Sequence, residues 1–403
     1  MNKTALRSVL ILVGVGMVFA SAAWLFRYSK INENDSVVRD ARTIVATCRS
    51  VTDYSKCYER EIPNLSGPRS VAYIFKVIAQ IRVLDPRYQF CHLAAHKVGA
   101  LRVLDDPEKW IDALHENPHD GLCSNGFIHG VIIGKFRDRV ITDEQFRDEL
   151  PQFERACEPT DSWQPSGLDK AMCYHAIGHL FTFVTNADMH RSLAMCRAVA
   201  AGPRDAYLRV CQEGVFMQVY QPVEPDDFEL LTHLPYVPTK DTFRKFCADF
   251  PKVDEYGACR REAAALLRPY LKRGIGSQLF CDGMPPDQSE ACYQSVVTLI
   301  GRTNLGKADA IVEGCKNMPA SWRSECFGRS ALAVIEEMRT DSEPAFAVCM
   351  RAEGATRSDC FAFLAERAPY VFSTERERTE FCTAISRYGA SCEGPGYTQK
   401  QGR

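Results

Sequence analysis

The sequence contains no CxxC pair and no CxxCH motif, although eighteen of its 403 residues are cysteines. The first absence removes support for zinc ribbons and thioredoxin-type redox sites, and the second removes support for covalently attached c-type haem. The phosphate-binding patterns GxxxxGK[ST] and GxGxxG are absent, as is the nucleophile motif GxSxG. Nucleotide-dependent chemistry and α/β-hydrolase chemistry are therefore unsupported.

The chain also lacks an excess of charge of either sign. Its formal net charge is -2, and its apolar and charged fractions of 46% and 25% are those of an ordinary globular protein. Without a basic excess, nucleic acid is not an expected partner. The length corresponds to two or three domains, or to one elongated repeat protein.

One long apolar run stands at the N-terminus. Residues Val9–Phe26 are nearly all apolar and are flanked by Lys3, Arg7, Arg27 and Lys30. About 18 apolar residues suffice to span a hydrocarbon core as a helix. The small residues "ASAA" (20–23) would suit a signal peptidase, but "WLF" continues the apolar run beyond them. We expect residues 1–30 to be an uncleaved signal anchor, with a cleaved signal peptide or a buried helix as alternatives.

The cysteines indicate the compartment. So many thiols suit an oxidising space such as a periplasm, where they form disulfides. The sequence therefore predicts a single-pass inner-membrane protein whose body lies in the periplasm or another extracytoplasmic space. An envelope protein is a further expected partner.

A period near 34 residues organises the C-terminal half. The first cysteine of each pair recurs at steps of 34, 34, 34 and 33, and the second follows 10 to 12 residues later, in the pairs Cys247 and Cys259, Cys281 and Cys292, Cys315 and Cys326, Cys349 and Cys360, and Cys382 and Cys392. A turn rich in Pro, Gly, Ser and Asp separates the cysteines of a pair, and a helical apolar pattern follows the second. Such a period is typical of stacked helical hairpins.

We therefore predict an all-α fold, a helical-hairpin repeat array (α-solenoid) stapled by disulfides. Its period equals that of tetratricopeptide repeats, so a TPR-like geometry is expected, although the Trp, Leu-Gly and Tyr positions of that consensus are absent. The predicted parts are the anchor (1–30), a histidine-bearing set of repeats (31–220), a proline-rich connection (221–239) and the regular repeats (240–403).

The same arrangement extends less regularly into the N-terminal half. Nearest-neighbour pairing there joins Cys48 to Cys57, Cys157 to Cys173 and Cys196 to Cys211, and leaves Cys91 and Cys123 to each other. Those two look like second cysteines of a pair, each opening a helix. Nine bridges would then use all eighteen cysteines, although sequence alone cannot prove the connectivity.

Four predicted helix starts carry pairs of coordinating side chains. Aligned on their cysteines, the segments "CHLAAHKVGAL", "CSNGFIHGVII", "CYHAIGHLFTF" and "CQEGVFMQVYQ" hold such pairs at i and i+4, namely His92 and His96, Asn125 and His129, His175 and His179, and Glu213 and Met217. Residues four apart lie on one face of a helix. Five of the nine histidines of the chain fall at these positions. The pattern predicts a metal site between these four helices.

Several donor sets fit this prediction. His96, His129 and His179 with the Met217 sulfur would suit copper, whereas adding Glu213 and either His92 or His175 would suit a two-metal site or a single iron or zinc ion. Non-covalent haem with His/His or His/Met ligands is a further alternative. Asp120 and Asp188 are carboxylates that could orient the imidazoles.

Two functions follow from these patterns. The first is an exported, membrane-tethered protein that binds a transition metal (copper, zinc or iron) or haem, and that could be a metalloenzyme. The second is an α-solenoid interaction scaffold of the cell envelope in which the histidines are buried structural residues. Gly126, Gly130, Gly178 and Gly214 stand beside the coordinating pairs and would allow close helix approach.

Overall fold

The computed structural model describes residues 34–67, 69–88, 90–104, 106–118, 120–136, 139–161, 163–222 and 225–392. Within these ranges the chain is helical and contains no strand, so the predicted all-α class is confirmed. The predicted anchor, residues 1–30, lies outside the described residues. Among the residues that are described, no helix is both long and apolar enough to cross a membrane.

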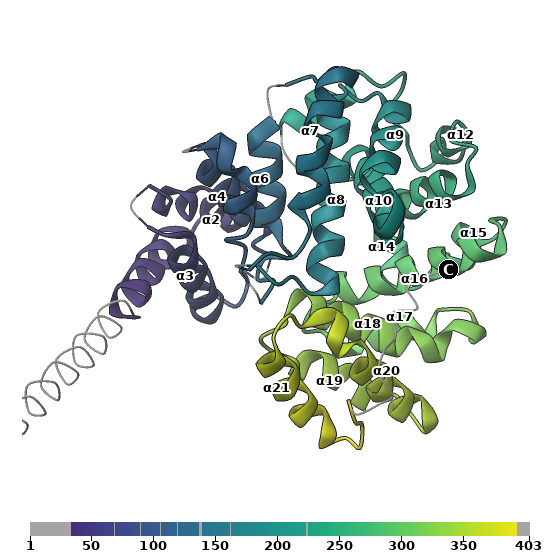
Figure 1. Ribbon diagram of the computed structural model, residues 1–403. Coiled ribbons are helices and arrows are strands. Elements are labelled where there is room, and N and C mark those ends of the chain that lie inside the picture. The colour runs from purple at the N-terminus through teal and green to yellow at the C-terminus, as the bar shows by residue number, and fades with distance from the viewer. Residues whose placement is uncertain are drawn as a thin grey trace, which may run out of the picture. The chain divides into compact units, whose positions relative to one another are not determined.

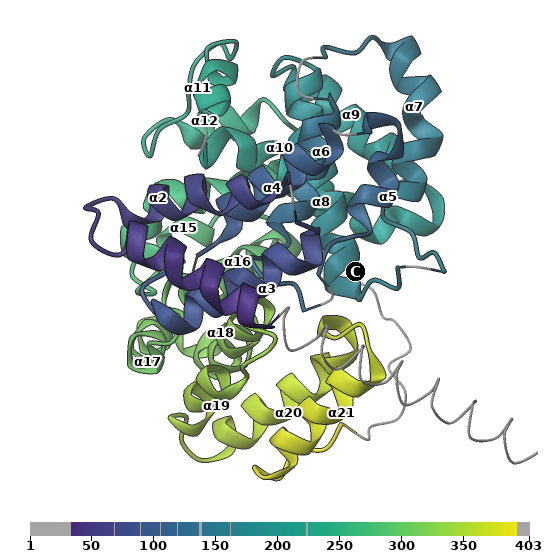
Figure 2. The same cartoon turned by 90° about the vertical axis from the view of Figure 1, so that its left-hand side faces the viewer.

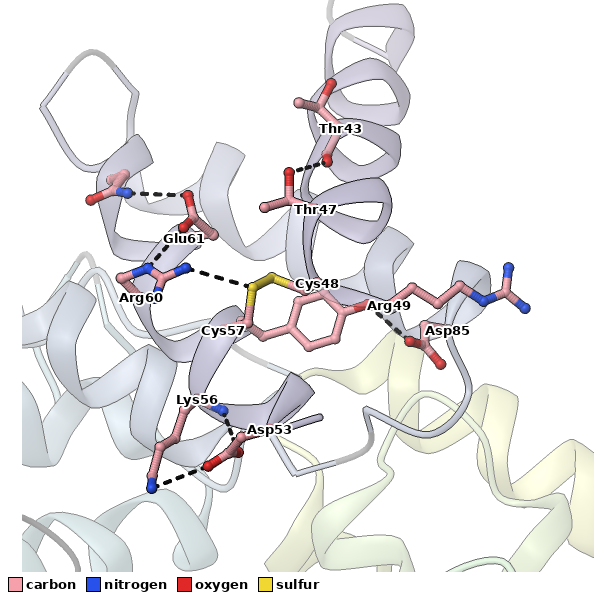
Figure 3. Close-up of a disulfide and its surroundings, with 12 residues drawn as sticks. Thr43, Thr47, Cys48, Arg49, Asp53, Lys56, Cys57, Arg60, Glu61 and Asp85 are labelled. Carbon is pink, nitrogen blue, oxygen red and sulfur yellow. Dashed lines mark hydrogen bonds and ion pairs between the residues drawn. A yellow bond between two sulfur atoms is a disulfide. The ribbon is translucent and has the colours of Figure 1, made fainter. Parts of the chain in front are cut away.

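The chain divides into two compact units, Met1–Ala94 and Ala95–Arg403. The described part of the first contains a helix over residues 34–48, α2 (Tyr54–Glu61), the 3-10 turn η1 (Pro63–Leu65) and α3 (Val71–Leu84). A disulfide between Cys48 and Cys57 joins the first two helices across a short turn (Figure 3). The buried hydroxyl of Tyr58 donates to the Asp85 carboxylate at 2.9 Å, which ties α2 to the end of α3.

The helix α4 (His92–Leu104) starts at the end of the first unit and continues into the second. The other helices of the second unit include α5 (Trp110–Leu114), α6 (Gly126–Phe136), α7 (Asp143–Ala156), α8 (Gly167–Val184), α9 (Met189–Val199), α10 (Leu208–Tyr220), α11 (Pro225–Leu231), α12 (Phe243–Ala248), α13 (Val253–Glu262), α14 (Arg268–Leu271), α15 (Ser277–Cys281), α16 (Pro286–Thr303), α17 (Ala308–Lys316), α18 (Arg323–Glu337), α19 (Glu343–Met350), α20 (Ala355–Val371) and α21 (Glu375–Ser386).

Capping boxes define the starts of three of these helices. At α8 the Ser166 hydroxyl accepts from the backbone N–H of Asp169, and the Asp169 carboxylate accepts from the backbone N–H of Ser166 at 3.0 Å. Thr142 begins α7 and Thr374 begins α21 in the same way. Each box satisfies two N–H groups that a helix start leaves without partners, and so fixes where the helix begins.

Disulfides staple the helical hairpins as predicted. Eight of the expected nearest-neighbour pairs are bonded, with Cα–Cα separations of 5.4–5.7 Å. Cys91 and Cys123 are also disulfide-bonded, which brings the total to nine. The partners of the eight described bridges lie 9–16 residues apart in the sequence. A bridge that closes a loop of this length stabilises the fold by roughly 2–4 kcal/mol.

The second cysteines differ from the expectation that each opens its helix. Cys173 lies in the second turn of α8, and Cys211 lies in the first turn of α10. Cys91 directly precedes α4, but α6 begins three residues after Cys123. There, Cys123, Ser124 and Asn125 all have positive φ angles, of 63°, 53° and 56°. The sequence does not predict this left-handed segment, because residues other than glycine adopt such angles uncommonly.

The second helices of successive hairpins pack side by side within the second unit. In chain order α6 packs against α8, α8 against α10, α10 against α13, α13 against α16, α16 against α18, and α18 against α20 (Figures 1 and 2). The first helices form their own contacts, such as α17 against α19. In addition α20 contacts α8, so the last repeats of this unit touch the histidine-bearing helix.

Glycines allow the closest of these helix contacts. A methyl group at Gly178 of α8 would overlap the backbone carbonyl of Cys211, and one at Gly214 of α10 would overlap that of His175. Gly130 of α6 stands in the same relation to the His96 carbonyl of α4. The expectation of close approach is therefore confirmed at these three positions.

Candidate metal centre

Three histidines from two neighbouring helices gather in the interior of the second unit. His129 comes from α6, and His175 and His179 come from α8. Their ring centroids lie 4.8 Å apart for His175 and His179, 5.2 Å for His129 and His179, and 5.9 Å for His129 and His175. All three are buried, with 6–9% of their surface exposed. The i, i+4 spacing on α8 and the packing of α6 against it produce this arrangement.

The sulfur of Met217 on α10 joins two of these imidazoles. The Nε2 atoms of His175 and His179 lie 3.1 Å apart. The Met217 Sδ lies 3.1 Å from the same Nε2 of His175. Three potential ligand atoms from α8 and α10 therefore converge, and the glycine contacts between these helices set the distance.

The tautomer of His175 follows from its backbone partner. Its Nδ1 lies 3.1 Å from the carbonyl oxygen of Val210. A carbonyl oxygen only accepts, so Nδ1 carries the proton and donates. In the neutral imidazole, Nε2 then presents a lone pair.

The tautomer of His179 is set by a relay of two side chains. Its Nδ1 lies 2.8 Å from Oε1 of Gln218. The Gln218 amide is oriented by its other end, because Nε2 donates to the Asp227 carboxylate at 2.6 Å. Gln218 and Asp227 are both buried. His179 therefore donates from Nδ1, and its Nε2 also presents a lone pair.

Two imidazole lone pairs and a thioether sulfur thus face one another. A thioether is only a weak acceptor, so Met217 supplies no proton to this group. Facing lone pairs repel, and a cation between the two nitrogens removes the repulsion, whether it is a proton shared in an N–H···N hydrogen bond or a metal ion. Metal–imidazole bonds of roughly 2.0–2.1 Å would reach both Nε2 atoms, which lie 3.1 Å apart, from one position between them.

The described residues contain no group of three or more His, Cys, Asp or Glu side chains already placed to hold one metal ion. The converging donors are instead two imidazoles and a thioether, with the ring of His129 beside them. This composition limits the chemistry to metals that accept nitrogen and soft sulfur ligands together.

The remaining predicted ligands are His92, His96 and Glu213. His92 is half-buried and stacks on Phe90, with ring centroids 5.9 Å apart. His96 is half-buried on α4, where its carbonyl faces Gly130. Glu213 forms an ion pair with Arg261 at 2.7 Å, although it lies one turn from Met217 on α10.

One expectation about the neighbouring residues is wrong. Asn125 precedes α6 in a left-handed conformation, so it does not form a helical i, i+4 pair with His129. Asp120 accepts from the Leu122 backbone, and Asp188 caps α9. The orienting groups are Gln218 and Asp227, and the one sequence signal for Gln218 is its place directly after Met217.

A charged group adjoins Glu213 on the neighbouring helices. Glu262 accepts from Gln221 at 3.1 Å and lies near both Glu213 and Arg261. Burial, followed by the negative charge of Glu213, raises the pKa of Glu262 to about 8. This carboxyl is therefore largely protonated at neutral pH.

The raised pKa predicts a pH-dependent stability. Folded protein holds a proton on Glu262 between its ordinary pKa of 4.5 and about 8, whereas the unfolded chain releases it. The stabilising contribution is complete below pH 4.5 and is lost as the pH rises through 8. The free energy of unfolding should therefore fall by on the order of a few kcal/mol between pH 4.5 and 8. We expect this fall to be smaller in Glu262→Gln, whose side chain does not titrate.

Urea unfolding of the two proteins across this pH range measures the difference. Glu343→Gln is the matched control, because the Glu343 side chain is 64% exposed. If the free energy of unfolding of Glu262→Gln changed with pH in the same way as that of the parent chain, the raised pKa of Glu262 would be contradicted.

Comparison of the chain with protein-family models, curated proteins and solved structures finds no match.

Proposed function

We propose that this is an exported, membrane-tethered protein that binds one transition-metal ion through His175, His179 and Met217, with His129 beside them. Its framework is an α-solenoid of TPR-like hairpins, in which α8 and α10 carry the ligands and α6 carries His129. The observation that carries the proposal is the convergence of two Nε2 lone pairs, whose imidazoles are held as Nδ1–H tautomers by Val210 and by the relay of Gln218.

Copper is the metal that this donor set favours. Imidazole nitrogen is a good ligand for copper, zinc and iron, but a thioether favours copper(I) among them. Haem is a weaker candidate, because ligands on opposite faces of its iron must stand further apart than the 3.1 Å between His175 Nε2 and Met217 Sδ.

The nine disulfides support an extracytoplasmic location. Together with the apolar segment Val9–Phe26, they favour an inner-membrane anchor with the body in the periplasm. In such a space copper encounters few free thiols, so nitrogen and thioether ligands are suitable ones.

Metal analysis of the full-length chain, produced in an oxidising compartment and purified in detergent, tests the proposal. Titration with copper(I) against a competing chelator should give a stoichiometry of about one ion per chain, because the donors complete a single site. The proposal fails if the folded, fully disulfide-bonded protein binds copper(I), zinc and iron no better than a chain lacking the three histidines.

A second candidate function is an envelope interaction scaffold. An open groove with a volume of about 590 Å³ lies between the segments around α15 and after α17, and its lining includes Leu279, Met318 and Arg323. Leu279 is 75% exposed there, so its apolar side chain is accessible to a partner. This function predicts binding of a partner protein that is unaffected by chelators and by loss of the histidines.

A further inference from the structure

A buried ion pair joins the last repeats to the histidine-bearing helices. Arg339, just after α18, donates to the Asp169 carboxylate at 2.8 Å, and the two side chains are only 2% and 4% exposed. The pair connects residues 170 positions apart in the sequence. Because both side chains are buried, removing one of them would leave an unpaired buried charge and destabilise the fold strongly. The exposed surface pairs of this chain contribute little to stability by comparison.

The same end of α18 holds the segment that leads into α6. Gly121 adopts a φ of +60°, and a side chain there would overlap the Arg339 guanidinium. Three residues further on, the Ser124 hydroxyl donates to the carboxylate of Glu337. Glycine at 121 suits both the positive backbone angle and the close approach of Arg339.

These contacts fall close to the ligands in the sequence. Asp169 is in the first turn of α8, ahead of His175 and His179 on the same helix. Ser124 belongs to the left-handed segment directly before α6, which carries His129. One element, the end of α18, thus contacts the starts of both helices that contribute imidazoles.

We propose that residues Glu337 and Arg339 form a clamp that sets the spacing between α6 and α8, with Arg339 as a positioning residue for the metal centre. The inference about the metal rests on the proposed function. The clamp itself fixes the relative positions of the three imidazoles, and it does so in the metal-free protein as well. A rigid helix transmits a shift of its first turn to residues one or two turns later, so loss of the pair displaces His175 relative to His129.

The test compares Arg339→Met with Arg351→Met in the full-length protein. Arg351 pairs with Asp309 at 2.5 Å, but the two side chains are 42% and 88% exposed, so this control removes an arginine ion pair that is accessible to water. Asp169→Asn is the second variant, because it keeps the shape of the side chain and removes its charge. Far-UV circular dichroism and non-reducing peptide mapping establish that each variant is folded with its disulfides intact.

The first readout is the set of imidazole signals in NMR spectra of histidine-labelled, metal-free protein. Arg339→Met and Asp169→Asn should shift the signals of His129 and His175, whereas Arg351→Met should leave them in place. Unchanged signals in both folded variants would overturn the clamp, whether or not the protein binds metal.

The second readout is copper(I) affinity against a competing chelator. Arg339→Met should lower it by about tenfold or more, as expected for loss of a group that orients ligands, and the Arg351→Met affinity should equal that of the parent chain. Shifted imidazoles with undiminished affinity would overturn the role of Arg339 as a positioning residue. If the parent chain binds no copper(I), the proposed function fails, and the imidazole signals alone decide whether the clamp exists.

Discussion

Replacing His179 by alanine should abolish stoichiometric copper binding, with a loss of affinity of at least about 100-fold. That loss exceeds the effect expected of residues that only orient ligands. His179 supplies one of the two Nε2 atoms that lie 3.1 Å apart, and no neighbouring donor is placed to replace it within the hydrogen-bonded group of His175, Met217 and Gln218. Titration of the purified variant with copper(I) against a chelator measures the change.

His233→Ala is the control, because His233 is exposed and lies in the proline-rich segment 221–239. Its copper affinity should equal that of the parent chain. The double variant with His175→Ala should lose little more than His179→Ala alone, since both residues serve one site. Additive, independent losses would instead indicate two separate sites and would contradict the single centre.

Introducing a methyl group at Gly178 should lower the free energy of unfolding by more than about 3 kcal/mol, at the upper end of what overpacking costs. The new Cβ would overlap the carbonyl oxygen of Cys211, which is backbone and cannot rotate away. Gly214→Ala should have a similar effect through the His175 carbonyl. Thermal or urea unfolding with the disulfides intact gives the difference.

The comparison for these variants is Gly67→Ala. Nothing lies within 4 Å of a Cβ at Gly67, and its φ is outside the left-handed region. Its free energy of unfolding should therefore change by at most about 1 kcal/mol. If Gly67→Ala and Gly178→Ala changed the free energy of unfolding equally, α8 and α10 would be able to move apart at little cost. Their contact would then not fix the separation of His175 from Met217.

Local periodicity explains which features were predictable from the sequence. The regular recurrence of cysteines indicated the stapled hairpins, because the two partners of each described bridge lie 9–16 residues apart. Histidines spaced four apart on aligned helices also indicated the grouping of His129, His175, His179 and Met217. In both cases a regular spacing in the sequence places residues next to one another, either on one face of a helix or in neighbouring repeats.

Features that depend on distant packing could not be predicted in this way. Arg339 and Asp169 are too far apart in the sequence for any period to relate them. Asp227 lies in a segment that looked like a plain connection, yet it orients Gln218 from α11. The left-handed residues before α6 have no glycine to mark them, since Ser124 and Asn125 adopt a conformation that surrounding contacts impose.

The disulfide ladder has a consequence for how the chain responds to proteases, which cut at exposed turns. Eight of the nine staples close a short loop around the turn between two helices, as Cys315 and Cys326 do around residues 316–325. A peptide bond cut inside such a loop leaves both fragments joined by the disulfide, so the two helices of the hairpin stay together and stay packed. Only cuts in the segments between staples release a fragment, and these segments are the helices and the connections from one hairpin to the next. Nicked protein should therefore migrate as intact chain until a reductant is added.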